Sequence, residues 1–413
     1  MRYLRLLLIC CCWLGTWNAA QAQGKLTGVV LDSVTHEPLA FSSVFLANTT
    51  LGATTTEQGQ FTFPKVPAGT YDVVGSYVGY RLAKQSVTMT AAAQQITLQL
   101  APTGNQLGEV VVKPEPNKPE EYQKFAKLFI GGSTFSAQCR ISNPDDVRVF
   151  YDDSTKTLTA QAKEFVQIDN EALGYRLKYY GLYFAADDDD GSISYYGQPV
   201  FEELKPRDER QRKQWAANRL TAYTGSFMHF LRSVYNNRVQ AEGFLTQQII
   251  VGANPRFERA DEKRLALLAS RPDNKFTAAE QDSLDKWEDM APVIATLNQK
   301  PLPIDSIRRV GTNGRRTFLR FTGELQVAHF GEAPDPLYKR PMSPLGYPKI
   351  PYPAKRQVSR LKLQGREAAI QANGSLLNPL DVYNGEYWGF EKIGEFLPFD
   401  YMPPTVSSAA PRR

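Results

Sequence analysis

The sequence predicts a mainly β protein with an α+β second domain: an N-terminal antiparallel β-sandwich, then a larger β-rich domain with a helical segment. Short runs rich in Val, Phe, Tyr and Thr alternate with turn residues over 25–100. Three prolines within 113–119 then mark a stiff, extended spacer. Apolar residues at helical spacing appear later, in 207–240, between further strand-like runs.

Residues 1–22 have the pattern of a secretory signal peptide. Arg2 and Arg5 precede an apolar run, and Ala20 and Ala22 supply the small residues that signal peptidase accepts. The apolar run is too short to span a bilayer as a stable helix. We therefore expect cleavage at this point and export, with the mature chain in the periplasm or associated with the outer membrane.

Cleavage would change the chemistry open to the chain. The sequence has 413 residues, four cysteines and a formal net charge of +5. Without residues 1–22, Cys139 is the single thiol and the net charge falls to +3, because two arginines and no acidic residue are lost. An intramolecular disulfide and a multi-thiolate zinc site are then excluded. We expect no nucleic-acid partner and no transmembrane segment after signal cleavage.

The mature N-terminus, 23–101, is expected to form the sandwich. Its breaks are turn-forming pairs and triplets that contain Pro or Gly, as many short strands in an antiparallel sandwich require. The charges of this segment balance. The strands expected from the pattern are 25–31, 40–46, 60–63, 71–77 and 95–100.

The order of short motifs in this segment carries a resemblance. The motifs are Gly28-Val29-Val30-Leu31-Asp32, Glu37-Pro38-Leu39-Ala40, Thr56-Glu57-Gln58-Gly59-Gln60-Phe61, Pro67-Ala68-Gly69-Thr70-Tyr71 and Val78-Gly79-Tyr80. Together they resemble the carboxypeptidase-regulatory-like domain, a transthyretin-like sandwich. The segment 107–112 is similar to the run that follows this domain in TonB-dependent receptors. Glu57 departs from the family, which usually has Asp in that turn. The resemblance implies regulation or folding support beside another module.

A zinc carboxypeptidase would need a His-x-x-Glu pair and a third histidine well downstream. His329 and Glu332 match the pair, but the chain has only three histidines and none follows Glu332. The match also ends the run 318–327, which predicts a strand. We therefore expect no zinc carboxypeptidase activity, and the sequence indicates no catalytic residue, no metal and no cofactor.

The second domain is expected at 120–402, after a Pro-rich linker at 102–119 and before a disordered tail at 403–413. The stretch 120–200 is strand-like throughout, with 147–151 and 157–162 around a polar hairpin turn and a Tyr-rich run from 173 to 196. An acidic run at 187–190 lacks the ligand spacing of an EF-hand and predicts a solvated hairpin tip.

The segment 207–240 is basic and predicts one or two amphipathic helices, with a break at Thr224-Gly225. On an unbroken helix Arg219, Tyr223 and Ser226 would share a face, with His229 at its edge. These four residues are the binding candidates. The alternative is a buried hydrogen-bond network that fixes the helix onto the sheet. No acidic orienter is evident beside Ser226 and His229, so a hydrolytic triad is unsupported.

The remaining elements complete the domain. Helices are expected at 258–270 and 277–290, the second with a capping box, and a proline-dense surface loop at 334–353. The segments 356–363, 369–376 and 387–396 follow. The order Trp215, Asn218-Arg219, Tyr223-Thr224-Gly225-Ser226, His229 to Arg232 and Glu242-Gly243-Phe244 resembles uncharacterised secreted proteins that pair such a region with the same regulatory-like domain.

These observations favour an exported cell-envelope protein that acts as a non-enzymatic binding or scaffolding module. Its partner would be an unknown envelope protein or a glycan, with peripheral association with the outer membrane. One alternative is a hydrolase with a site in 120–402, which predicts a pocket where acids or His229 converge. Another is carbohydrate binding by exposed tyrosines between Tyr175 and Tyr196.

Overall fold

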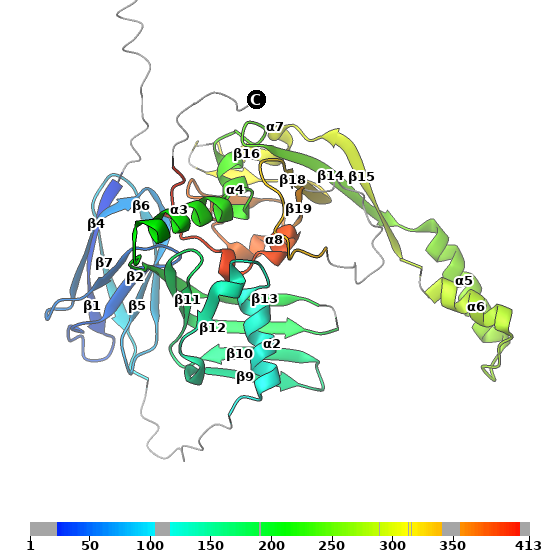
Figure 1. Cartoon of the computed structure of the whole chain (residues 1–413), viewed down its shortest axis with the longest axis horizontal. Coiled ribbons are helices and arrows are strands. Elements are labelled where there is room, and N and C mark those ends of the chain that lie inside the picture. Colours follow the sequence, from blue (N-terminus) through cyan, green and yellow to red (C-terminus); the bar gives the residue numbers. More distant parts are fainter. Residues whose placement is uncertain are drawn as a thin grey trace, which may run out of the picture. The chain divides into compact units, whose positions relative to one another are not determined.

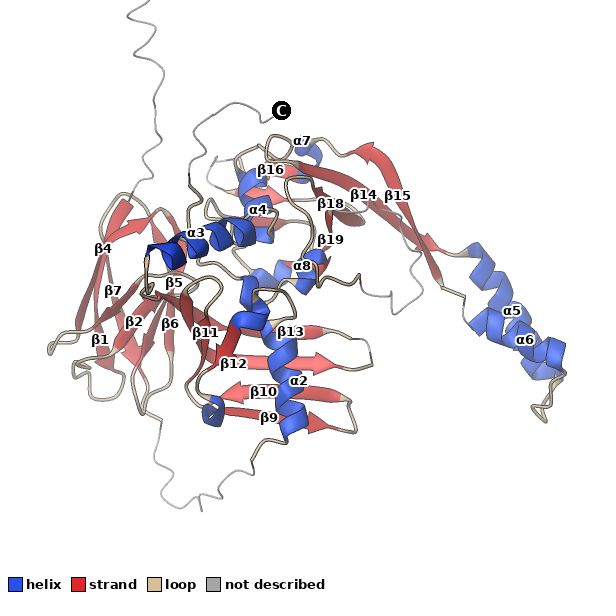
Figure 2. Ribbon diagram, in the orientation of Figure 1, coloured by secondary structure: helices blue, strands red, loops and turns tan. Residues whose placement is uncertain are grey.

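The computed structural model describes residues 23–103, 116–189, 191–288, 290–312, 314, 316–340 and 356–404. It is mainly β, with a β-sandwich at the N-terminus and an α+β remainder, which confirms the predicted fold class (Figures 1 and 2). Contacts divide the chain into two compact units, 1–47 with 51–109 and 48–50 with 110–413. The expected signal peptide, most of the expected linker and nearly all of the expected tail lie outside the described residues.

The first unit is a sandwich of two sheets. In the first sheet, β1 (Gln23–Asp32) lies between β4 (Gln60–Pro67) and β7 (Gln94–Leu100). The second sheet has the order β3 (Gly52–Thr54), β2 (Ser43–Leu46), β5 (Gly69–Ser76) and β6 (Ala83–Met89). Alternate residues of β1 are buried, which gives the period of two expected of a strand with one face on a core.

One pairing departs from the predicted antiparallel pattern. β1 and β7 run parallel, with Leu26 opposite Gln94, whereas the other pairs of both sheets are antiparallel. The chain reaches β7 from β6 of the opposite sheet, and such a crossover allows parallel pairing where a hairpin would not. The five predicted strands all fall on observed ones, and the pattern missed β3 and β6.

The second unit begins with a six-stranded antiparallel sheet. Its strands are β8 (Cys139–Ile141), β9 (Val147–Asp152), β10 (Thr157–Ala162), β11 (Phe165–Asn170), β12 (Tyr175–Asp187) and β13 (Ile193–Glu203). The long strand β12 pairs with β13 along one edge, and with β11 and then β10 along the other. The predicted hairpin around 152–157 is β9 and β10.

A helix that the sequence analysis missed covers one face of this sheet. α2 (Pro119–Ile130) buries Phe125 and Phe129, which pack on Phe184 and Tyr179 with ring centroids 5.1 and 5.3 Å apart. The expectation that 120–200 is strand-like throughout is therefore wrong at its start. The helix had sequence signals: a proline in its first turn, two glutamates after it, and aromatic residues four apart.

Two helices follow the sheet, α3 (Glu209–Tyr223) and α4 (Phe227–Tyr235). The chain breaks between them as expected at Thr224-Gly225, where Gly225 has φ 82°. A left-handed residue stops a helix, and glycine adopts this conformation without a Cβ penalty. The assumption of one unbroken helical face does not hold.

A five-stranded sheet forms the rest of the unit, in the order β15 (Val293–Pro301), β14 (Phe244–Ala253), β18 (Glu324–His329), β19 (Gln357–Leu363) and β21 (Val382–Glu386). A smaller sheet has β17 (Thr317–Leu319) between β16 (Arg308–Val310) and β20 (Ala368–Ile370). The predicted single strand 318–327 is thus two strands, β17 and β18, with Gly323 at φ 72° in the turn between them. The short helices are α7 (Ile304–Ile307), α8 (Tyr387–Phe390), η1 (Ser136–Gln138), η2 (Pro144–Asp146), η3 (Pro379–Asp381) and η4 (Ile393–Glu395).

A helical hairpin is inserted between β14 and β15. It consists of α5 (Pro255–Ser270) and α6 (Ala278–Glu288), close to the two predicted helices, and Figure 1 shows it at the end of the β14–β15 ribbon. The predicted capping box is formed: the Glu280 carboxylate accepts the Thr277 backbone N–H over 2.8 Å, and Thr277 Oγ1 accepts that of Glu280 over 3.3 Å. Of the expected proline-rich loop, 341–355 lies outside the described residues.

Candidate functional site

Three side chains on α3 bind consecutive carbonyls of the turn before β12. Trp215 Nε1 donates to Glu171 O over 2.8 Å, and Asn218 Nδ2 donates to Ala172 O over 2.7 Å. The guanidinium of Arg219 donates to the next two carbonyls, of Leu173 and Gly174, over 2.7 and 3.1 Å. Because each carbonyl receives a donor, this row fixes α3 to the sheet.

The Arg219 side chain also contacts two residues of the sheet. Beyond the two carbonyls, its Nη1 lies 3.0 Å from Oε1 of Glu203, and its guanidinium stacks over the ring of Tyr175 at 3.9 Å. Burial raises the pKa of Tyr175, while the Arg219 charge acts to lower it. The contacts of this predicted binding residue thus lie within the second unit, between α3 and the first sheet.

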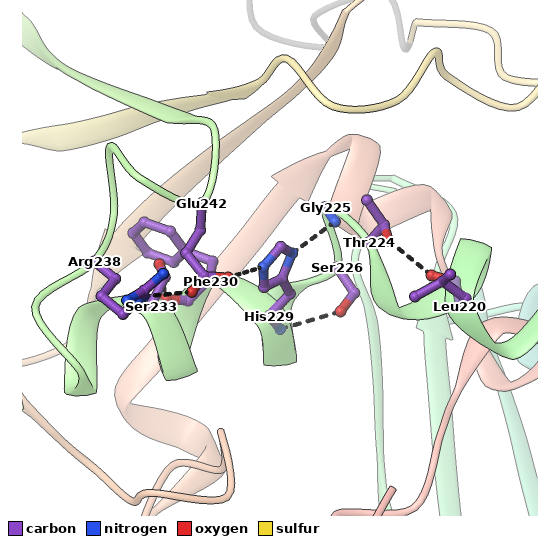
Figure 3. Close-up of polar contacts among 9 residues, drawn as sticks. All are labelled: Leu220, Thr224, Gly225, Ser226, His229, Phe230, Ser233, Arg238 and Glu242. Carbon is purple, nitrogen blue, oxygen red and sulfur yellow. Dashed lines mark hydrogen bonds and ion pairs between the residues drawn. The ribbon is translucent and has the colours of Figure 1, made fainter. Parts of the chain in front are cut away.

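Ser226 caps α4. Its hydroxyl oxygen accepts the backbone N–H of His229 over 3.2 Å, which satisfies one of the free donors at the helix start (Figure 3). A serine nucleophile would instead have to donate its proton to an imidazole nitrogen. The imidazole of His229 points toward Gly225 and Glu242, so the two side chains do not form a catalytic pair (Figure 3).

His229 is 7% exposed and both of its ring nitrogens are engaged. Nδ1 accepts the backbone N–H of Gly225 over 3.0 Å, so Nδ1 is unprotonated and Nε2 carries the proton. Nε2 donates to Oε2 of Glu242 over 2.8 Å, and the other carboxylate oxygen of Glu242 lies 2.9 Å from Nε of Arg238. Burial lowers the pKa of His229, although the bond to Glu242 acts to raise it. Burial acts to raise the pKa of Glu242, but the bonds from His229 and Arg238 lower it overall.

Tyr223 and Arg232 extend this network. The Tyr223 ring lies 4.7 Å from the imidazole of His229 and 5.3 Å from the guanidinium of Arg232, and burial raises the pKa of Tyr223. Arg232, which the sequence analysis did not single out, donates to the carbonyls of Asn373, Phe399 and Tyr401 over 2.9 to 3.1 Å. The structure thus brings Tyr223, Ser226 and His229 together, whereas Arg219 contacts Tyr175.

A second histidine lies against the first. The rings of His229 and His329 are 5.7 Å apart, although the residues are distant in sequence. Burial lowers the pKa of His329 to about 4, and repulsion from His229 acts in the same direction when that ring is protonated. Nδ1 of His329, Oε1 of Gln357 and Oε2 of Glu332 are buried, and none of them has a hydrogen-bond partner among the described residues. Among the described residues, no group of three His, Cys, Asp or Glu side chains could hold a metal ion.

Buried acids lie near this histidine. Burial and the charge of Glu395 raise the pKa of Glu332 to about 7, although a bond from Gln357 opposes the shift. Burial also raises the pKa of Glu395 to about 7. Such values are typical of a general acid or base, but the hydrolase alternative also requires a pocket. Two pockets in the described part of the chain, one beside α3 and one beside β14, are lined neither by these residues nor by His229.

The tyrosines of β12 and β13 divide between the two faces of the first sheet of the second unit. Tyr179 and Tyr195 face α2. Tyr183 and Tyr196 point to the opposite side, because each adjoins a residue that faces α2, Phe184 and Tyr195, and neighbouring residues of a strand alternate. Tyr183 is 38% and Tyr196 61% exposed, and their rings stack 5.0 Å apart at an angle of 19°. Phe150 of β9, 64% exposed, lies on the same side. We call Phe150, Tyr183 and Tyr196 the aromatic face.

Comparison with known families assigns the first domain. The model of the CarboxypepD_reg-like domain matches residues 26–112, so the chain contains such a domain, as the motifs predicted. A search of the curated proteins finds no match to this chain. In the part of the chain that the structure describes, no helix is long and apolar enough to cross a membrane.

Comparison with solved structures finds partial likenesses. The group B streptococcus pilus 2b backbone protein is 19% identical, with 19% of this chain and 41% of that chain covered and a TM-score of 0.18. A type II cohesin–X-dockerin complex from Acetivibrio cellulolyticus is 19% identical, with shares of 27% and 76% and a TM-score of 0.18. A Lactobacillus rhamnosus GG shaft pilin is 18% identical, with shares of 20% and 47% and a TM-score of 0.17. The chain spans less than half the length of either pilin.

Proposed function

We propose that this chain is an exported, non-enzymatic binding or scaffolding module of the cell envelope. The observation that carries the proposal is the aromatic face. Three large aromatic side chains are exposed together on the side of a sheet opposite its covering helix, where a packed domain would ordinarily bury them. Aromatic residues clustered on a surface are typical of sites that bind another molecule.

The polar chemistry of the second unit supports a module without catalysis. The groups that resemble catalytic residues are engaged in holding the fold: Ser226 caps a helix, and His229 joins Gly225 to Glu242. A general base needs a free nitrogen directed at the substrate, and neither nitrogen of His229 meets that requirement. Among the described residues, the contacts of Ser226 and His229 therefore do not favour the hydrolase alternative.

The domain division belongs to the same proposal. Residues 1–22 are the signal peptide, 23–101 the regulatory-like sandwich, 102–119 the linker, 120–402 the binding domain and 403–413 the tail. A regulatory-like domain beside another module suits an accessory role in presenting that module at the envelope. Fractionation of expressing cells, with N-terminal sequencing of the mature chain, tests export. A mature chain that begins at Gln23 in the envelope fraction supports it, and an uncleaved cytoplasmic chain contradicts it.

Binding is tested with the full mature chain. The wild type, the variant F150A/Y183A/Y196A and the control Y383A are immobilised and exposed to solubilised envelope fractions. Tyr383 is a suitable control because it is an exposed tyrosine, 57% accessible, on another sheet. We expect the wild type and Y383A to retain the same partner and the triple variant to lose it. Equal capture by all three proteins would contradict the proposal.

A further inference from the structure

The residues around the aromatic face indicate the chemical class of the ligand that it binds. Strand pairing places Arg148, Gln161, Tyr183 and Tyr196 in one row across four strands. The next row on the same side contains Phe150, Thr159 and Ser194. The stacked tyrosines are thus flanked by an amide and by hydroxyl groups.

Two of the cations that border the face are paired with acids. Lys178 and Arg176, further along β12, pair with Glu202 and Asp169 at 2.7 and 2.6 Å. Arg148, at the end of the row, donates to the Asp145 carbonyl over 2.8 Å. The centre of the face therefore presents aromatic rings, an amide and hydroxyls, while the guanidinium of Arg148 at the end of the row is bonded to neutral backbone carbonyls.

From this combination we infer that the aromatic face is a binding site for a neutral glycan. The inference rests on the proposed function and names its ligand class. A pyranose ring has an apolar face of C–H groups that packs against an aromatic ring, and its hydroxyls need donors and acceptors at the ring edge. Tyr183 and Tyr196 form the platform, and Gln161, exposed beside Tyr183, supplies the amide.

The distribution of charge around the aromatic face favours a neutral ligand over an anionic one. An anionic glycan or nucleic acid would require free cations near the rings, since affinity for such ligands comes mostly from Lys and Arg contacts. Arg176 and Lys178 on β12 are already paired with acids, and Arg148 lies at the far end of the row, on β9. A protein partner would fit the three aromatic residues but would not require the neutral polar border.

Native affinity electrophoresis of the mature chain tests the inference. The probes are the neutral polysaccharides laminarin, xylan, galactomannan and dextran, with polygalacturonate as the anionic comparison. We expect retardation by at least one neutral polysaccharide, and about tenfold weaker binding for Y183A and for Y196A, a loss typical of a residue at the centre of a site. Q161A should weaken binding several-fold, while Y383A binds as the wild type.

The outcomes separate this inference from the proposed function. No retardation by any neutral polysaccharide, or retardation unchanged in folded Y183A and Y196A, overturns it. Retardation by polygalacturonate alone also overturns it. If the face captures an envelope protein but no polysaccharide, the glycan inference fails and the binding module stands. If it captures neither, both fail. Thermal melting of each variant shows that a loss is not caused by unfolding.

Discussion

Nε2 of His229 donates a hydrogen bond of 2.8 Å to Oε2 of Glu242, and this bond links α4 to the chain just before β14. The same ring accepts the Gly225 N–H, so one imidazole ties the break between α3 and α4 to the five-stranded sheet. The pair has the composition of a catalytic dyad, but the backbone donor on Nδ1 makes it a structural one.

Substitution of His229 by Ala should destabilise the protein by about 2–4 kcal/mol, because it leaves the Gly225 N–H and the Glu242 carboxylate without this partner. E242Q keeps an acceptor oxygen for Nε2 and should cost less than half as much. Urea unfolding of both variants measures the difference. An H229A variant as stable as the wild type would show that this hydrogen bond does not contribute to stability.

Acid should destabilise the fold through His329. Burial holds its pKa at about 4 in the folded state, against about 6.5 when unfolded, so the unfolded chain takes up the proton first. The contribution of neutral His329 to the free energy of unfolding is therefore complete above pH 6.5. It is lost as the pH falls toward 4, by up to about 3 kcal/mol. The lowered pKa of His229 acts with the same sign. Urea midpoints measured between pH 4 and 7 test this, and H329N should flatten the profile.

The buried acids should act with the opposite sign. The pKa values of Glu332 and Glu395, raised to about 7, mean that the folded state holds these protons more firmly than the unfolded chain. The stability they contribute is present below the unfolded pKa and is lost as the pH rises through 7. E395Q, which mimics the protonated acid, should melt above the wild type at pH 8, and by a smaller margin at pH 5.5. E262Q, at an exposed helix position, is the control and should show no such pH dependence.

The Arg232 side chain should be among the most sensitive in the second unit. It is 6% exposed and donates to three carbonyls, two of them in the segment after η4. R232M leaves those acceptors without a donor and should cost at least about 3 kcal/mol in urea unfolding. R264M, which breaks an ion pair on the surface of α5, should cost less than about 1 kcal/mol. Similar losses for the two variants would contradict this assignment.

Gly225 should tolerate no side chain. A Cβ there would lie 2.0 Å from Gln357 Oε1 and 2.8 Å from His329 Nδ1, and φ is already 82°. G225A should therefore lower stability by more than the 1–2 kcal/mol of a left-handed alanine, roughly 3 kcal/mol or more. Alanine at Gly79, φ 84° with open space around it, shows the backbone cost alone. A G225A melting temperature equal to that of G79A would refute the close contact.

Local patterns were enough to predict much of the fold. The β9–β10 hairpin, the break at Gly225 and the capping box of Thr277 each depend on neighbouring residues, and each was found from the sequence. Contacts between residues that are distant in the sequence could not be predicted in this way. His229 and His329 meet because β14 pairs with β18, a relationship with no local signal.

The tyrosine run shows why the faces of a strand are harder to predict than the strand itself. The register between β12 and β13 shifts between Tyr180 and Tyr183, so a strict alternation carried from Tyr175 would place Tyr183 on the buried side. Only with this irregularity do Tyr183 and Tyr196 come to stack on the outside.

The place where α5 and α6 enter the sheet has a consequence for how this chain can vary. Ala253 and Val293 are paired at the end of the ribbon, so the whole helical hairpin is inserted between two partners that remain opposite each other. Insertions and deletions between them leave the register of the five-stranded sheet unchanged. Among relatives of this chain, length differences should therefore occur mainly in the helical hairpin of α5 and α6. The residues of α3 that bind backbone carbonyls, Trp215, Asn218 and Arg219, should stay constant.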